Sequence, residues 1–290
     1  GTLGIPEFGT KFVIQMLVDT KPKTFAELIK ISGLSHGTDV WLGNAQDLIK
    51  NNIVPFKDVI GCRDDIMVYL RYHGMKDLDA FKIMEFVRKG KASKEPDKWV
   101  DFKNKMKEAG IEEWFIDSCN KIKYMFPKAH ATAYVTSAFR IAWYKVHEPH
   151  SFYIQYLSLR CDAYEIETMT KGIEAIQARM KDIEDRQAVK DLSNPVTNKE
   201  KSLLSTLEVC EELYARGYSI AKVDINKSDA TSFKVFKEDT HTIIPPFTVV
   251  DGLGANVAKS IVKAREENPF LSKEDIIKRT DLSSTMLKKL

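Results

Sequence analysis

Two glycines two residues apart, Gly252 and Gly254, separate the apolar run 247–250 from a helical pattern over 255–262. Glycine adopts positive φ without strain, so the pair predicts a tight turn. Such a turn bares the backbone amides that begin the next helix, where the helix dipole also favours an anion. Lys259 follows on the same helix and would add a positive charge. The pattern predicts a phosphate-binding turn, with an ordinary tight turn as the alternative.

A turn of this kind between two helices is a helix-hairpin-helix, which holds nucleic-acid phosphates through main-chain nitrogens and reads no base sequence. A second, degenerate copy follows, with helical patterns over 270–280 and 285–290 around the turn 281–284. Its turn lacks glycine, so we expect it to be mainly structural. The predicted DNA-binding residues are Gly252, Leu253, Gly254, Asn256, Lys259, Ser283 and Ser284.

A second candidate site surrounds Pro127, a residue that suits the first turn of a helix. Lys123 and Lys128 flank this helix start, and ammonium groups beside free amides favour a polyphosphate. His130 and Tyr134 follow at i, i+4 spacing, so their rings would share one helix face and could flank a nucleobase. A solvated basic turn before a packed, alanine-rich helix is the alternative.

Other polar clusters have simpler explanations. Ser35, His36 and Asp39 suggest a hydrolase, but neighbours in sequence do not define a triad, and no G-x-S-x-G motif is present. We favour helix capping for Asp39. Asp77 and Asp79 resemble the carboxylates of a two-metal site. They open a helical pattern, however, where the dipole explains them, and we assign them no catalytic role.

Composition sets limits on the class of protein. With 44 Lys and Arg against 41 Asp and Glu the net charge is only +3, so bulk charge does not indicate nucleic-acid binding. The four cysteines form no C-x-x-C pair, which disfavours zinc and predicts free thiols in a reducing compartment. No apolar run reaches the ~20 residues of a membrane span, and no signal peptide is visible. We expect a cytoplasmic segment of a longer protein, without a membrane partner.

The element pattern predicts a mainly α protein. A helical domain is expected over 1–190, a linker over 191–198, and a small α+β domain over 199–290 that ends in the two hairpins. A capping box, Thr24 to Glu27, begins an early helix. Further helices are expected over 40–51, 77–87, 96–110, 112–125, 127–147, 151–161, 163–189 and 199–216, and strands around 220–225, 232–237 and 242–244.

Three longer motifs, 32–41, 61–67 and 124–131, together resemble one family. They are similar to the replicative DNA polymerase III alpha subunit of the PolC type, the C-family enzyme of low-GC Gram-positive bacteria. The resemblance covers nearly the whole chain in the order of the family. It implies that residues 1–190 are polymerase fingers, which hold the incoming dNTP and the template base. It also implies that residues 199–290 bind duplex DNA.

The same resemblance implies that the catalytic aspartates lie in a palm domain outside this chain. Mg2+ would be bound mainly there, so no catalytic or metal residue is assigned here, and the segment alone is expected to be inactive. The implied partners are primer–template DNA, dNTPs, the replication sliding clamp and other replisome subunits. The predicted nucleotide-binding residues are Ser35, His36, Gly37, Arg63, Lys123, Phe126, Lys128, His130 and Tyr134.

Individual roles also follow from the resemblance. Arg63 and Lys128 would meet the triphosphate, and Phe126 would form part of the pocket for base-mimicking inhibitors. The alternative to a polymerase segment is a protein of another functional class, a non-polymerase helix-hairpin-helix protein for DNA binding or repair. A repair glycosylase would need an Asp or Lys shortly after its hairpin, facing a base pocket, and Asp275 and Asp281 are the candidates by spacing.

Overall fold

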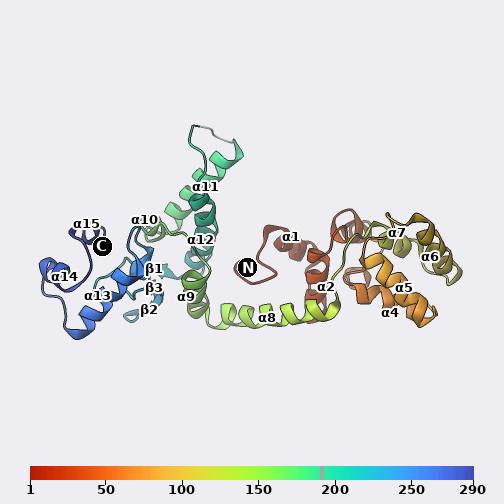
Figure 1. The fold of residues 1–290 in the computed structure, drawn as a ribbon, viewed down its shortest axis with the longest axis horizontal. Coiled ribbons are helices and arrows are strands. Elements are labelled where there is room, and N and C mark those ends of the chain that lie inside the picture. The colour runs from red at the N-terminus through yellow and green to blue at the C-terminus, as the bar shows by residue number, and fades with distance from the viewer. Residues whose placement is uncertain (190–192) are drawn as a thin grey trace. The chain divides into compact units, whose positions relative to one another are not determined.

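The computed structural model describes residues 1–189 and 193–290, a mainly helical chain with one small sheet (Figure 1). The predicted fold class is therefore confirmed. The chain divides into two compact units, Gly1–Ala142 and Trp143–Leu290. This boundary falls at a different place from the predicted linker, and residues 190–192 of that prediction lie outside the described residues. The functional division at 191–198 stays a prediction.

The first unit is a stack of short helices. It contains α1 (Lys11–Thr20), α2 (Phe25–His36), η1 (Trp41–Ala45), α3 (Gln46–Lys50), η2 (Phe56–Asp58), α4 (Arg63–Tyr72), α5 (Asp77–Arg88), α6 (Pro96–Glu108), α7 (Glu113–Lys121) and most of α8 (Lys128–His147). The capping box is confirmed, since Thr24 Oγ1 accepts from the Glu27 amide at 3.2 Å and Glu27 Oε2 accepts from the Thr24 amide at 2.9 Å. Helices α4 and α5 pack against each other.

Two of the helices predicted in the first unit differ from the structure. The helix expected over 40–51 is interrupted because Gly43 has φ +68° and Asn44 is also non-helical. The Asn44 side chain turns inward, and its Oδ1 accepts from Ser118 Oγ at 2.6 Å. The helix expected over 112–125 ends at Lys121. The chain beyond it is extended because Tyr124 pairs with the end of α2.

The second unit combines helices with the sheet. It contains α9 (Pro149–Leu159), α10 (Ile166–Met169), α11 (Ile173–Ala188), α12 (Asn198–Ala215), β1 (Ser219–Ile220), β2 (Lys234–Phe236), β3 (Asp239–Ile244), η3 (Phe247–Val249), α13 (Ala255–Glu267), α14 (Lys273–Arg279) and α15 (Ser284–Leu287). The strand order is β1-β3-β2, with β1 parallel and β2 antiparallel to β3. The single helix expected over 163–189 is wrong, because Gly172 has φ +99° and separates α10 from α11.

A buried polar cluster fixes the last turn of α8 in the second unit. Lys145 Nζ lies 2.6 Å from Glu212 Oε1, which also accepts from the Tyr153 hydroxyl at 2.7 Å. Arg216 donates to the Lys145 carbonyl at 2.9 Å. Burial lowers the pKa of Lys145, although the pairing with Glu212 opposes that shift. The cluster joins the end of α8 to α9 and α12.

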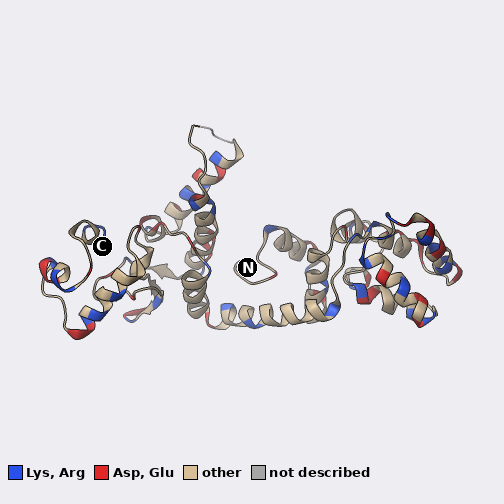
Figure 2. Cartoon of the chain, in the orientation of Figure 1, with Lys and Arg blue, Asp and Glu red and all other residues tan. Residues whose placement is uncertain are grey.

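Charged residues are distributed unevenly over the helices, and the cysteines are free thiols. Lys and Arg alternate with Asp and Glu along α5 and α6, whereas α8 contains no acidic residue (Figure 2). All four cysteines are free, and burial raises the pKa of Cys62 to about 12. Within the described part of the chain, no helix is both long and apolar enough to span a bilayer.

Candidate functional site

An extended segment between α7 and α8 forms the centre of the first candidate site. Thr38, just after α2, donates its amide to the Tyr124 carbonyl at 2.9 Å. Arg63, the first residue of α4, donates its amide to the Phe126 carbonyl at 3.2 Å. The ends of two helices therefore hold this segment by its backbone, so the Tyr124 and Phe126 side chains project from a fixed support.

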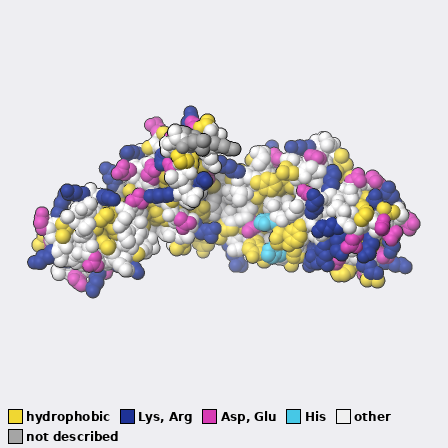
Figure 3. Space-filling view, turned by 45° about the horizontal axis from the view of Figure 1, so that its top comes forward, with side chains coloured by type: hydrophobic (Ala, Val, Ile, Leu, Met, Phe, Trp, Pro, Cys, Tyr) yellow, Lys and Arg dark blue, Asp and Glu magenta, His cyan; other side chains and the backbone are white. Residues whose placement is uncertain are grey.

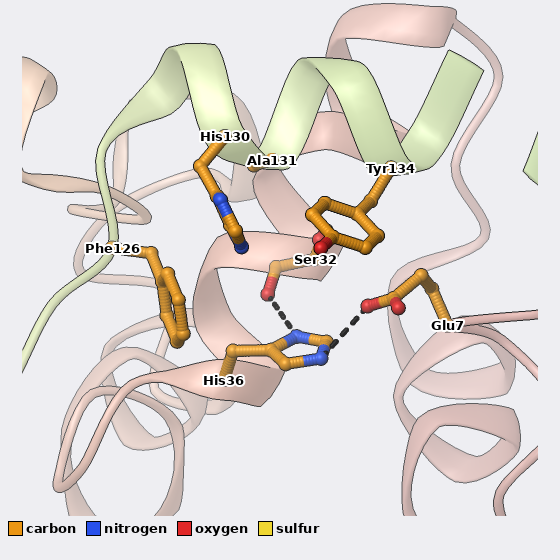
Figure 4. Close-up of a pocket in the computed structure, with 7 residues that line it drawn as sticks. All are labelled: Glu7, Ser32, His36, Phe126, His130, Ala131 and Tyr134. Atoms are coloured by element: carbon orange, nitrogen blue, oxygen red, sulfur yellow. Dashed lines mark hydrogen bonds and ion pairs between the residues drawn. The ribbon is translucent and has the colours of Figure 1, made fainter. Parts of the chain in front are cut away.

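A cavity of about 200 Å³ lies beside this segment (Figure 4). The Phe126 ring stacks on His130 with centroids 4.9 Å apart, and His130 lies 4.5 Å from Tyr134. His36 approaches Phe126 edge-on at 5.7 Å. The structure thus brings together four of the predicted nucleotide-binding residues. The lining residues are Glu7, Ser32, His36, Phe126, His130, Ala131 and Tyr134.

His36 is held at both ring nitrogens. Its Nδ1 lies 2.8 Å from the Ser32 carbonyl oxygen and 3.0 Å from Ser35 Oγ. Its Nε2 lies 2.7 Å from Glu7 Oε2. Sequence reasoning missed Glu7, because no local pattern connects a residue of the N-terminal loop with the end of α2. A glutamate at a positive φ of 69° could not be recognised from residue spacing.

The remaining predicted nucleotide-binding residues do not line the cavity. Ser35 contacts His36 through its hydroxyl, as described above. Gly37 is the C-cap of α2, and a Cβ built there would lie 2.4 Å from Val40 Cγ2. Lys123 forms an ion pair of 2.7 Å with Asp39. The capping role favoured for Asp39 is therefore wrong, because Val40 occupies the cap position and Asp39 binds Lys123 instead.

The start of α8 is only partly free for an anion. The Lys128 amide donates to Asp64 Oδ2 at 2.6 Å, so a carboxylate already caps this helix. The exposed Lys128 ammonium has no ion-pair partner among residues 1–189 and 193–290. An incoming phosphate would therefore meet the Lys128 side chain rather than its amide.

Arg63 belongs to a cluster of cations around one carboxylate. Glu85 lies 3.7 Å from Arg63, 2.5 Å from Arg88 and 3.1 Å from Lys89. The hydrogen bond from Arg88 is the main cause that lowers the pKa of Glu85 to about 2. Three cations against one carboxylate leave excess positive charge. Figure 3 shows Lys and Arg side chains grouped on a face that also exposes histidine.

The second candidate site is the glycine turn before α13. Gly252 has φ +87°, as predicted for a tight turn. Gly254 is the N-cap of α13 without a side-chain cap, and a Cβ built there meets open space. The Leu253 side chain is buried and its amide already donates to the Val250 carbonyl at 3.0 Å, whereas Asn256 and Lys259 are exposed. The turn presents uncapped amides to solvent, which is the geometry of an anion site.

The second hairpin is capped by its own side chain. Ser283 Oγ accepts from the Met286 amide at 3.2 Å at the start of α15, and Ser284 is exposed beside it. The Asp281 amide donates to Ser260 Oγ at 3.0 Å, which ties this turn to α13. An amide that already has a partner binds phosphate less readily. This difference agrees with a mainly structural second turn.

One of the two candidate residues for a repair glycosylase, Asp275, is already used structurally. Asp275 Oδ2 accepts from the Leu271 amide at 3.1 Å and from Arg279 at 3.0 Å. The backbone hydrogen bond from Leu271 is the first cause that lowers the pKa of Asp275. Asp281 is exposed in the turn.

No group of three or more His, Cys, Asp or Glu residues could hold a metal ion within the part of the chain that the structure describes. Residues 1–110 match the family model of the bacterial DNA polymerase III alpha subunit finger domain. Residues 217–290 match the model of the helix-hairpin-helix motif. The fold and the two matches define a polymerase finger region followed by a hairpin module.

The particular family follows from comparison with curated proteins. Over its whole length the chain is 57% identical to DNA polymerase III PolC-type from Oceanobacillus iheyensis and 56% identical to that from Bacillus subtilis. Over 99% of its length it is 53% identical to the PolC-type protein from Lacticaseibacillus paracasei. The chain belongs to the PolC-type DNA polymerase III family. It spans 19% of the length of each of these relatives.

Proposed function

We propose that the chain is the fingers and duplex-binding segment of a bacterial replicative DNA-directed DNA polymerase, a nucleotidyltransferase. Residues 1–190 form the fingers, 191–198 a linker, and 199–290 the duplex-binding part. The observation that carries the proposal is the aromatic stack of Phe126, His130 and Tyr134 beside the Lys128 ammonium, which has no ion-pair partner among the described residues. Stacked rings suit a nucleobase, and the cation suits its phosphates.

The fingers contribute position and charge rather than proton transfer. Lys128 and Arg63 neutralise the triphosphate, while Ser35, Gly37 and Lys123 support the surrounding loop. Holding the α-phosphate in line with the primer 3′-hydroxyl makes the reaction effectively unimolecular, and cations stabilise the departing pyrophosphate. Mg2+ supplies further charge stabilisation when bound, mainly by palm carboxylates outside this chain. The segment alone is therefore inactive.

The hairpins hold the duplex product behind the reacting end. The amides of Gly252, Gly254, Ala255 and Asn256 and the Lys259 ammonium bind phosphates without reading base sequence. The substrates of the complete enzyme are primer–template DNA and dNTPs. The replication sliding clamp and other replisome subunits are its protein partners, and its location is the cytoplasm.

Replacement of Lys128 by alanine tests the nucleotide site. In the full-length polymerase, Lys128→Ala is expected to raise the KM for dNTP or lower kcat by at least about tenfold, which corresponds to ~1.4 kcal/mol. Lys50→Ala, which removes another exposed lysine in the same unit, is the control and should change neither constant. Steady-state kinetics equal to wild type in Lys128→Ala would contradict the assignment.

A further inference from the structure

The N-terminal loop, residues 1–10, is anchored firmly beside the aromatic cavity. Ile5 and Phe8 are each only 4% exposed. Thr2 Oγ1 donates to the Phe8 carbonyl at 2.7 Å, and the Ile5 amide donates to the Thr2 carbonyl at 2.9 Å. Buried side chains on both sides of Glu7 therefore determine where its carboxylate points. Figure 4 shows that it reaches the cavity from the side opposite Phe126.

The backbone of Glu7 is strained. Its φ of 69° lies in the left-handed region, where a residue with a Cβ costs about 1 kcal/mol more than glycine. Such conformations are held in place by their surroundings and cluster at functional sites. Glycine would adopt this conformation without strain, so the turn itself does not require a glutamate. The contribution of Glu7 to this site therefore comes from its side chain.

That side chain completes the support of His36. Both ring nitrogens have a partner, since Nδ1 lies 2.8 Å from the Ser32 carbonyl oxygen and Nε2 lies 2.7 Å from the Glu7 carboxylate. The Glu7 side chain is 19% exposed and the His36 side chain 39% exposed, so this contact is partly shielded from solvent. Without Glu7 the imidazole would be held at one end only. Its edge contact with Phe126 would then loosen.

We propose that Glu7 is a positioning residue of the nucleotide pocket, which acts through His36 on the stacked rings. This inference rests on the proposed nucleotide-binding function of the cavity. A side chain that contacts a ligand keeps its geometry only when a second residue holds it. Glu7 supplies that second residue from a loop distant in sequence.

Glu7→Gly separates positioning from a structural role. The substitution removes the carboxylate and also the backbone strain, so the melting temperature should stay within about 2 °C of wild type. In the full-length polymerase the KM for dNTP should rise about tenfold, the size expected for a lost hydrogen bond to a charged group, with kcat changed less than about twofold. Glu7→Gln retains an acceptor at the same reach and should restore KM to within about threefold of wild type.

Two further variants complete the test. Asp79→Ala removes an ion pair of 2.9 Å elsewhere in the same unit and should leave KM unchanged. In a His36→Ala background, Glu7→Gly should have no additional effect on KM, because the residue on which it acts is gone. This loss of effect distinguishes action through His36 from a separate contact with the nucleotide.

The possible results distinguish a failure of the proposed role of Glu7 from a failure of the proposed nucleotide-binding function. A raised KM in His36→Ala together with a wild-type KM in Glu7→Gly would overturn the role of Glu7 and leave the nucleotide pocket standing. Wild-type KM values in both variants would overturn the pocket and the inference together. Additive effects of the two substitutions would show that Glu7 does not act through His36.

Discussion

The uncapped turn at Gly254 permits a substitution that should change DNA binding without changing the fold. Gly254 has φ −75° and ψ 158°, an extended conformation that valine readily adopts. A Cβ at this position meets no atom within 4 Å. Gly254→Val should therefore fold normally. Its methyl groups, however, would cover the amides that begin α13 and keep a phosphate away from them.

The expected loss can be worked from counterion release. Each phosphate contact contributes about −0.9 to the slope of log K against log salt, so one lost contact at ~0.1 M salt weakens binding about eightfold. The slope should fall in magnitude by about 0.9. Gly252→Ala is a different case, because its φ of +87° strains any other residue, and we expect it to lower stability as well as affinity.

Fluorescence anisotropy with labelled duplex and the whole chain, over ~50–200 mM NaCl, measures both quantities. Asn268→Val is the matched control, because it places valine on extended backbone at the opposite end of α13, and it should bind as wild type does. In the full-length polymerase, Gly254→Val should shorten synthesis runs and spare single dNTP addition at saturating DNA. Unchanged affinity and slope in a folded Gly254→Val protein would refute the hairpin as a phosphate site.

Two further predictions concern the first unit. Gly33→Ala would place a Cβ 2.2 Å from the Gly61 carbonyl oxygen, and we expect it to lower the free energy of unfolding by about 1–3 kcal/mol in urea titrations, despite alanine's helix preference. Equal stability of this variant would show that α2 and Gly61 do not pack so closely. The pKa of Glu85 is lowered from 4.5 to about 2, chiefly by the hydrogen bond from Arg88. Ionised Glu85 therefore stabilises the fold above pH ~4.5, and this stabilisation is lost as the pH falls toward 2. Glu85→Gln should therefore be less stable than wild type at pH 7, by on the order of 1 kcal/mol. The difference in melting temperature between the two proteins should disappear near pH 2. A difference that does not depend on pH would show that the ionised carboxylate of Glu85 is not its cause.

Local signals in the sequence were sufficient for most helix starts and for the hairpin turn. The Thr24–Glu27 capping box and the helix that begins at Pro96 depend on residues within one turn of each other, so spacing alone reveals them. The Gly252 turn is of the same kind. The breaks at Gly43 and Gly172 were missed because glycine within a helical pattern either continues the helix or ends it. The local sequence does not distinguish the two outcomes.

Local residue spacing did not predict contacts between side chains that are distant in sequence. The helix start at Lys128 predicted free amides, but Asp64 from α4 accepts from the first of them. The pocket residues His130 and Tyr134 were predicted from one helix face and Phe126 from the family resemblance, whereas Glu7 enters from another part of the fold. These contacts depend on how separate elements pack, and residue periodicity contains no information about that packing.

The pairing of the basic side chains affects how a polyphosphate would bind. Lys123 and Arg63 already face carboxylates, and those pairs must loosen before either cation meets a phosphate. The Lys123–Asp39 pair is well exposed, so its rearrangement costs little. Each such exchange nevertheless reduces the net gain from the new contact. Lys128 has no such partner within the described residues, so its contact with phosphate contributes fully to binding. We therefore expect Lys128 to contribute more to nucleotide affinity than Lys123, although both flank the same helix start.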